Sequence, residues 1–566
     1  MKFRYLIGCL LVLAGCKTQS QSQAPADADA DVQTTTATVP QAQVRNVFER
    51  PKLVVGVVVD QMRPEYLYRF ADDFTEGGFK RLMREGYINH NTHYNYIPTY
   101  TGPGHASVYS GATPATHGII GNSWYSRELA KSVYCVADTT AQAVGSSTGA
   151  AASPHRLLVT NLADELKLAT NRRAKVVGVS LKDRSAVLPA GHIPDGAYWY
   201  DGSSGSFITS TYYMQQLPAW ASDFNSRQLA DQYLDSTWTL LMPEANYRNS
   251  GPDDQPYEKV FKGKETSTFP YALAELRKEN GNFGLLNYTP WGNTIVTDIA
   301  LAALEGEAMG QDETVDLLAV SYSTPDIVGH NFGLRSRELH DIYLRLDREI
   351  ARLLEALDEQ VGQGNYLLFL TADHAAADVP QFLVNERIPA GNYADKPLFV
   401  GLNERLEQRF KQAGLVEYII NDQVYLNHEK ITKAGLVLAE VQQATVDYLN
   451  MQPYMVDAYT AGNMRQQEYS GGIRHLLQMG FYRPRSGDVL YLLNPAWMEE
   501  MTIATTHGSG YNYDTHVPLM WYGWQIEQGN SYKRQTITDI APTVSHLLGI
   551  GLPNGATGNP IIELVK

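Results

Sequence analysis

Long apolar segments that end in polar residues recur along the chain. Residues 53–59 form a continuous β-branched run followed by Asp60, a pattern typical of a strand buried on both faces of a sheet. Residues 176–181, 315–322 and 366–370 repeat this pattern, and residues 517–522 predict a further strand. Each of the first four runs leads into charged residues, as expected at the carboxyl ends of strands in an open α/β sheet.

Helical periodicity separates these runs. Residues 336–357 place leucine, isoleucine and tyrosine on one stripe, with charged residues elsewhere, which predicts an amphipathic helix. Residues 538–548 predict a shorter helix that Gly549 closes. We therefore predict an α/β fold with a mostly parallel central sheet, flanked by helices and carrying functional residues at one edge.

Two segments are predicted to be insertions in this fold. Residues 201–291 are rich in Tyr, Trp, Ser and Asn, and residues 379–501 separate the last parallel strand from the C-terminal motifs. We expect each to form a cap or subdomain beside a cleft, within one catalytic domain spanning residues 47–566.

The N-terminus predicts export. Lys2 and Arg4 precede a short apolar run that is too short to span a bilayer and ends in Leu13-Ala14-Gly15-Cys16. This resembles the signal of a bacterial lipoprotein over residues 1–16, and an ordinary secretory signal is the alternative. We expect a periplasmic protein anchored to a membrane through lipidated Cys16. Residues 17–46 lack large apolar side chains and predict a disordered tether.

Charge narrows the class of partner. The net charge is −15 without a long basic run, which argues against a nucleic-acid partner. A small anionic substrate remains compatible, because local cations in a cleft can outweigh the net charge. Of three cysteines, Cys9 and Cys16 lie in the predicted signal. Cys135 is then left alone, so no intramolecular disulfide is expected after processing.

A hydroxyl group at a predicted turn is the first candidate for catalysis. Thr101 is followed by Gly102 and Pro103, and residues 106–109 are predicted to begin a helix. The free N–H groups at a helix N-terminus favour an anion, so Thr101 is a candidate nucleophile for phosphoryl transfer. The alternative is a threonine that merely caps a helix.

Residues with the side-chain types of zinc ligands follow the predicted strands. Asp326 and His330 are four residues apart, so one helical turn would place them on the same face. Asp373 and His374 are adjacent and could contact one ion only from an irregular loop. The alternatives are turn-forming aspartates, a hydrogen-bonded Asp–His pair and solvated histidines. The candidate set is Asp60, Asp326, His330, Asp373, His374 and His507.

These motifs together resemble the alkaline phosphatase superfamily, and most closely its monomeric bacterial phosphate-irrepressible (PafA-type) alkaline phosphatases with a threonine nucleophile. The motifs that carry the resemblance are VVVDQMRPEYL, YTGPGHASVYSG, GIIGNSW, VSLKDRSAV, STPDIVGHNFG, LTADHA and THGSGYNYDTHVP.

The resemblance implies two Zn²⁺ ions. Asp326, His330 and His507 would hold one ion. The second would be held by Asp60, Asp373 and His374, with the Thr101 hydroxyl bridging to it. The other nearby histidines match no ligand position, although a loop shift could exchange His516 with His507; they are His105, His117 and His516.

Three further residues are expected to contact the phosphoryl oxygens. Lys182 and Arg184 follow a predicted strand and would share a face in extended geometry, and the resemblance adds Asn122. The alternative is that the two cations are surface charges paired with Asp183 or Asp60. Two cations suit the dianion of a phosphate monoester, so we predict a phosphomonoesterase of broad leaving-group tolerance. A phosphodiesterase or nucleotide pyrophosphatase, or a non-catalytic phosphate-binding lipoprotein, is the alternative.

Overall fold

A computed structural model describes residues 49–500 and 504–565 of the chain. The predicted signal peptide with Cys16 and the predicted tether, residues 1–46, lie outside the described residues. No described helix has the length and apolar composition needed to cross a membrane.

Four parallel strands form the centre of the fold, as predicted. β1 (Leu53–Val59) pairs with both β11 (Asp316–Tyr322) and β12 (Tyr366–Thr371), and β11 pairs with β6 (Val176–Ser180). Every residue of these strands is buried, which explains why they appear in the sequence as unbroken apolar runs. Their carboxyl ends meet at one edge of the sheet.

The described residues extend this centre into an 11-stranded sheet. The order is β20-β2-β19-β12-β1-β11-β6-β7-β8-β5, and β21 also pairs with β2. The predicted strand at 517–522 is β19 (His516–Gly523), which runs antiparallel between β12 and β2. The remaining strands are β2 (Tyr87–His93), β5 (Ala143–Val144), β7 (Gly196–Asp201), β8 (Ser206–Ser210), β20 (Gly529–Ser531) and β21 (Gln535–Thr536). The predicted mostly parallel α/β sheet is confirmed.

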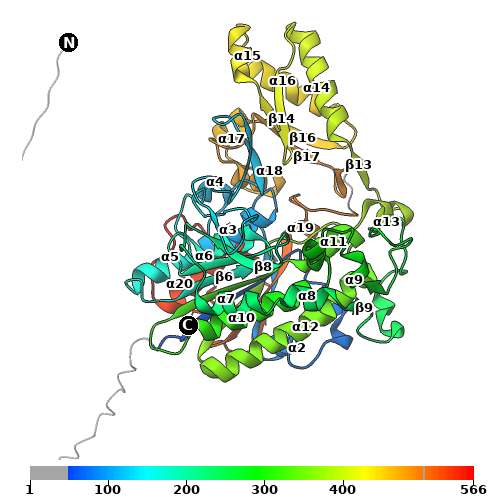
Figure 1. The fold of residues 1–566 in the computed structure, drawn as a ribbon. Coiled ribbons are helices and arrows are strands. Elements are labelled where there is room, and N and C mark those ends of the chain that lie inside the picture. Colours follow the sequence, from blue (N-terminus) through cyan, green and yellow to red (C-terminus); the bar gives the residue numbers. More distant parts are fainter. Residues whose placement is uncertain (1–48, 501–503, 566) are drawn as a thin grey trace, which may run out of the picture. The chain divides into compact units, whose positions relative to one another are not determined.

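Helices cover both faces of this sheet. Figure 1 shows α3 (Thr101–Ser110) and α6 (Asp183–Ala190) on one side of β6, with α10 (Trp291–Gly306) and α12 (Arg337–Leu357) on the other. The predicted helix at 336–357 is α12, and Ser336 caps it by accepting a hydrogen bond from the Leu339 N–H. The predicted C-terminal helix is α20 (Ile540–Leu548), which ends at Gly549 in the left-handed conformation.

The first predicted insertion, residues 201–291, joins the main core. It contributes β8 to the large sheet, and its buried aromatic residues, including Trp238 and Tyr271, belong to the same hydrophobic cluster as β1 and β12. Its other α-helices and strands include α7 (Ala219–Ser226), α8 (Leu229–Leu234), β9 (Thr237–Trp238), β10 (Tyr271–Ala272) and α9 (Leu273–Leu276).

The second predicted insertion, residues 379–501, contains a lobe with its own core. Four strands pair in the order β14-β15-β17-β16, and their buried side chains form a separate hydrophobic cluster with the adjacent helices. Figure 1 shows α14, α15 and α16 beside these strands. The bounds are α14 (Asp395–Phe410), β14 (Val416–Ile420), β15 (Gln423–Leu426), α15 (His428–Lys433), α16 (Leu438–Leu449), β16 (Met455–Thr460) and β17 (Val489–Leu493).

Candidate active site

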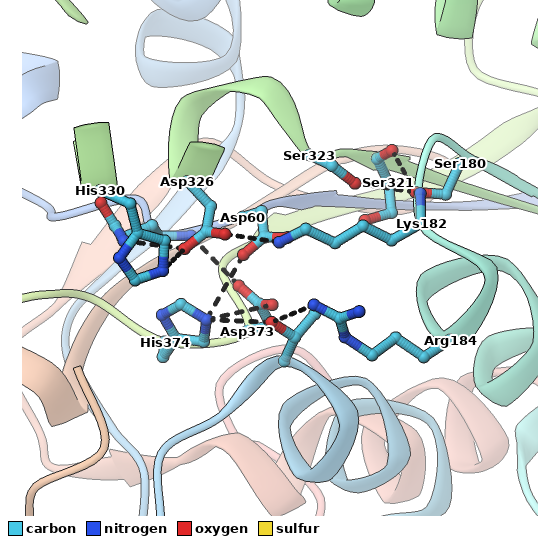
Figure 2. Close-up of polar contacts among 12 residues, drawn as sticks. Asp60, Ser180, Lys182, Arg184, Ser321, Ser323, Asp326, His330, Asp373 and His374 are labelled. Atoms are coloured by element: carbon cyan, nitrogen blue, oxygen red, sulfur yellow. Dashed lines mark hydrogen bonds and ion pairs between the residues drawn. The ribbon is translucent and has the colours of Figure 1, made fainter. Parts of the chain in front are cut away.

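Carboxylates and histidines from distant parts of the chain meet at the carboxyl edge of the central strands. Asp60 directly follows β1, Asp326 lies in α11 (Thr324–Phe332) after β11, and Asp373 follows β12. All three side chains are buried, and Figure 2 shows them turned toward one another. Parallel neighbouring strands therefore bring residues separated by hundreds of positions into one site.

The pair Asp326 and His330 lies on one face of α11, as their spacing predicts. His330 Nε2 lies 3.1 Å from Asp326 Oδ1, while His330 Nδ1 donates to the Thr505 carbonyl at 2.7 Å. Burial lowers the pKa of His330, but the charge of Asp326 and the hydrogen bonds to Asp326 and the Thr505 carbonyl together outweigh burial, so the net pKa is raised. The carbonyl bond fixes the ring with Nε2 facing the site.

Asp373 and His374 lie in an irregular segment after β12, which is the condition under which both could contact one ion. His374 Nε2 lies 3.4 Å from Asp60 Oδ1 and 3.5 Å from Asp373 Oδ2. Burial, and then the charge of Asp60, raises the pKa of Asp373 well above its usual value. The two adjacent side chains therefore converge on the same place.

His507 completes the cluster from the C-terminal part of the chain. Its Nδ1 contacts the Thr99 carbonyl at 2.7 Å, and its Nε2 lies 3.6 Å from Asp326 Oδ1. The ring is buried and stacks on His374. The glycine-rich turn that follows, with Gly508 at φ +130°, lets this ring reach the site.

Two overlapping groups of side chains could each hold a metal ion, and we call them the metal-type groups. One group is Asp326, His374 and His507, and the other is Asp60, Asp373 and His374. Each brings three ligand atoms within 4.8 Å of one another. His374 thus belongs to both groups, whereas the sequence assigned it to one and placed His330 with Asp326 and His507.

The chemistry of these groups fits bound cations. Asp60 Oδ1 and Asp373 Oδ2 are buried and accept no hydrogen bond in the described structure. Buried carboxylate oxygens without partners are costly, because they lose their hydration and gain nothing in exchange. A cation beside them would remove that cost. The donor set of imidazole and carboxylate groups suits zinc, although ligand type alone does not distinguish it from other divalent metals.

Thr101 lies next to both groups. Its side chain is buried, and its Oγ lies 3.4 Å from Arg184 Nη2 and 3.5 Å from His374 Nε2. The prediction that the helix begins at 106–109 is wrong, because α3 already begins at Thr101. Tyr100 adopts the extended conformation before it, so the Gly102-Pro103 pair forms the first helical turn instead of breaking it. The hydroxyl is consequently at the N-terminus of a ten-residue helix.

Asn122 lies against the start of the same helix. Its Oδ1 accepts the Gly102 N–H at 2.7 Å. Because that oxygen is used, the Nδ2 group is the part of the side chain that can donate to a substrate. Asn122 therefore lies beside the residue that follows Thr101, as a role for both at one phosphate site requires.

Lys182 and Arg184 both face the site, but not through an extended strand. β6 ends at Ser180, Lys182 is the residue before α6, and Arg184 lies in the first turn of α6. Lys182 Nζ donates to Asp60 Oδ2 at 2.6 Å and to Asp326 Oδ2 at 2.5 Å. Pairing with Asp60 was the alternative prediction, but as a surface contact; here Asp60 is fully buried and the Lys182 side chain is only 12% exposed.

Arg184 is positioned by residues that the sequence analysis missed. Its Nη1 donates to the Tyr134 hydroxyl at 3.0 Å, and that hydroxyl donates to Asp183 Oδ1 at 2.5 Å. Gln61 was also missed: its Nε2 donates to Asp326 Oδ1 at 2.7 Å, and its N–H donates to Asp373 Oδ1 at 3.2 Å. Adjacency to Asp60 was the one available signal for Gln61.

The remaining histidines make structural contacts. His105 contacts the Thr101 carbonyl and the Ser321 hydroxyl, and His117 contacts the Ser107 hydroxyl. His516 lies at the start of β19 and contacts the His90 carbonyl. None of the three belongs to a metal-type group in the described residues.

Comparison with known proteins agrees with this geometry. Residues 54–516 match the family model described as type I phosphodiesterase / nucleotide pyrophosphatase. Alkaline phosphatase PhoV of Synechococcus elongatus is 44% identical over 91% of this chain and 93% of its own length. A Myroides odoratus protein named a calcium-transporting ATPase is 42% identical over 92% of this chain and 95% of its own.

A solved structure resembles the whole described fold. Alkaline phosphatase PafA of Elizabethkingia meningoseptica is 42% identical over 93% of this chain and 96% of its own length. A crystal structure of wild-type PafA superimposes with a TM-score of 0.89, covering 92% of this chain and 100% of that one. The chain belongs to the type I phosphodiesterase / nucleotide pyrophosphatase family, within the alkaline phosphatase superfamily. The predicted family, fold and enzyme class are thereby confirmed.

Proposed function

We propose that this chain is an exported zinc-dependent alkaline phosphatase that hydrolyses phosphate monoesters by attack of the Thr101 hydroxyl oxygen. The observation that carries the proposal is the position of that oxygen. It lies at the N-terminus of α3, 3.4 Å from Arg184 Nη2 and 3.5 Å from His374 Nε2. The proposed nucleophile, a helix N-terminus that favours anions, and side chains that can bind metal ions therefore occupy one buried site.

The proposed metal ligands are the residues of the two metal-type groups together with His330. Asp326, His330 and His507 would hold one zinc ion; the second would be held by Asp60, Asp373 and His374 together with Thr101. When bound, a pair of zinc ions lowers the pKa of a coordinated hydroxyl group and neutralises charge on the reacting phosphoryl oxygens.

The protein's own groups would orient the phosphate. Arg184 can offer a planar pair of donors, Lys182 a point charge, and Asn122 Nδ2 a neutral donor. Thr101 Oγ would form a new bond to phosphorus, in line with the leaving alcohol, as the bond to that alcohol breaks. Water would then cleave the resulting phospho-Thr101, which returns the hydroxyl and releases inorganic phosphate.

The charge at the site favours monoesters over diesters. A monoester dianion can use both Lys182 and Arg184, whereas the phosphoryl group of a diester carries a single negative charge. The family also includes phosphodiesterases, so diester hydrolysis is the second candidate activity. The test is to assay zinc-loaded protein with a mono-aryl phosphate and the matching bis-aryl phosphate. We expect a higher kcat/KM for the monoester, and the reverse order would overturn the assignment.

We further propose that the protein is a monomer held in the periplasm by a lipid on Cys16. The sequence Leu13-Ala14-Gly15-Cys16 supports the anchor. The test is metabolic labelling with a radioactive fatty acid in a bacterial host. Label lost in Cys16→Ser would support lipidation, and equal labelling of both proteins would contradict it.

A further inference from the structure

A pocket of about 460 Å³ adjoins the proposed active site, and residues of both that site and the lobe line it. From the proposed active site, its lining includes Asn122, His330 and His507, together with Tyr100, the neighbour of the proposed nucleophile. The remainder is lined by residues of the 379–501 segment, by Ala377 and by residues between 506 and 514. A leaving group attached to a phosphoryl group at Thr101 would extend into such a space.

The β14–β15 turn fixes this pocket relative to the proposed phosphate site. Asn421 and Asp422 form the turn, with φ near +55° at both, as in a tight hairpin. Asn421 Nδ2 donates to the Ser123 carbonyl at 2.7 Å, next to Asn122. The side of the turn that bears Asp422 is thereby held beside the residues expected to bind the phosphoryl oxygens.

The pocket wall is strongly acidic. Its lining residues among the described part of the chain include four carboxylates and neither lysine nor arginine; the carboxylates are Asp395, Asp422, Glu499 and Asp514. Burial, and then the charge of Asp395, raises the pKa of both Asp422 and Glu499 to about 7. A cation bound in the pocket would relieve this repulsion between carboxylates.

Two buried oxygens of this wall have no hydrogen-bond donor. Asp514 is 1% exposed, and its Oδ1 accepts no hydrogen bond in the described structure, although Oδ2 accepts from the Ser509 N–H and hydroxyl. Asp395 Oδ1 is likewise without a donor. Because unpartnered buried carboxylate oxygens are costly, they indicate a ligand that brings positive charge.

Aromatic rings complete the wall. The aromatic residues that line the pocket are Tyr100, Tyr393, Tyr418, Tyr491, Trp497 and Tyr513. The faces of such rings attract ammonium groups, most strongly where water is excluded. Aromatic faces combined with carboxylates therefore favour an organic cation. A metal ion is disfavoured, because these carboxylates form no metal-type group in the described residues.

An acidic wall would also repel a phosphate dianion unless the substrate carried compensating charge. We propose that this pocket binds the leaving group and favours phosphate monoesters of alcohols that carry an ammonium group. Aminoalkyl and quaternary-ammonium alkyl phosphates are the substrate class. The inference depends on the proposed monoesterase function, because the pocket acts on the leaving alcohol of that reaction.

The test compares two substrates of nearly the same shape. Choline phosphate and 3,3-dimethylbutyl phosphate differ in a quaternary nitrogen replaced by carbon, so they separate charge from size. We expect the zinc-loaded protein to show a kcat/KM about ten-fold higher for choline phosphate, the size expected for desolvated cation–π and charge contacts. A ratio near one overturns the inference but leaves the monoesterase proposal intact. Failure to hydrolyse either monoester, with hydrolysis of a bis-aryl phosphate, overturns both.

Substitutions of the acidic residues test whether the pocket wall causes the preference for choline phosphate. In Asp422→Asn and Glu499→Gln, we expect the ratio of the two kcat/KM values to fall about three-fold or more, because each change removes one charge. The ratio does not depend on the fraction of folded protein. Glu404→Gln, on the exposed face of α14 in the same lobe, is the matched control and should keep the wild-type ratio. Equal ratios in all four proteins would contradict the proposed role of the wall.

Discussion

The imidazole rings of His374 and His507 stack with their centroids 3.4 Å apart and an angle of 14° between their planes. One ring follows β12, and the other comes from the turn before α19 (Asn512–Thr515). Burial, and then the charges of His374 and His330, lowers the pKa of His507 well below its usual value. His507 is therefore neutral, the form in which imidazole binds metal ions.

This stacking predicts that loss of one ring affects metal content. We expect His507→Ala to bind one zinc ion less per chain and to lose about 10²-fold or more in kcat/KM, because a ligand and its orienting contact disappear together. His516→Ala is the control, since His516 lies outside both metal-type groups. The measurement is metal analysis of dialysed protein beside a phosphatase assay. Unchanged zinc content in His507→Ala would contradict the proposed ligand set.

The two proposed phosphate-binding cations predict a change in selectivity. We expect Arg184→Ala to lower kcat/KM for an aryl monoester by about 10- to 100-fold, the range for losing one or two charge-assisted hydrogen bonds. The diester rate should fall less, so the monoester/diester ratio decreases. Lys175→Ala is a matched control, because Lys175 pairs with Glu307 away from the site. An equal loss for both ester types would show that Arg184 does not discriminate between them.

Close packing behind the site predicts sensitivity at Gly104. A Cβ atom at this position of α3 would lie 2.3 Å from the Asp373 carbonyl oxygen, which is part of the backbone. Gly104→Ala must therefore displace Asp373, and we expect about 10- to 100-fold weaker metal binding, as for other losses of support behind a ligand. Gly471→Ala is the control, since a Cβ there meets nothing within 4 Å. Competition with a zinc chelator measures the affinity, and wild-type affinity in Gly104→Ala would contradict the packing argument.

A buried glutamate that belongs to neither metal-type group predicts a pH dependence of stability. Burial raises the pKa of Glu258 from 4.5 to about 8. The folded chain thus keeps a proton that the unfolded chain loses. The contribution of Glu258 to the free energy of unfolding is therefore fully present below pH 4.5 and is lost as pH rises toward 8. Glu258→Gln should reduce this loss, which is on the order of a few kcal/mol. Urea denaturation at pH 5.5 and pH 8 measures it.

The control for that experiment is Glu265→Gln, at an exposed position of the same segment. It should keep the wild-type difference in unfolding free energy between the two pH values. If Glu258→Gln keeps that difference too, Glu258 is not protonated in the folded chain.

The central sheet was predictable because its parallel strands are buried on both faces. The runs at 53–59 and 366–370 lack polar interruptions, so their bounds in the sequence agree with β1 and β12 to within one residue. The antiparallel direction of β19 was not predicted, since an apolar run carries no sign of its partner's direction. The start of α3 was misplaced, because glycine and proline in a first helical turn look like a break.

The sequence predicted the candidate metal ligands but not the residues that hydrogen-bond to the site residues and position them. Asp326 and His330 reveal themselves by helical spacing, whereas the contacts of Gln61 and Tyr134 depend on loops that only the folded chain brings together. The acidic pocket could not be predicted from the sequence for a similar reason. Asp422 comes from the β14–β15 turn and Asp514 from α19, so they have no spacing in common that a sequence pattern could show.

The central claim is that Thr101 carries the phosphoryl group during turnover. The most direct measurement is mass spectrometry of the peptide containing Thr101, after zinc-loaded protein is mixed with a phosphate monoester and quenched in acid. We expect one phosphoryl group on Thr101 of the wild-type protein. Metal-loaded Thr101→Ala should form no such adduct, and its activity should be lower by a factor of about 10³ or more. A phosphoryl group on another residue, or Thr101→Ala that retains wild-type turnover, would contradict the account.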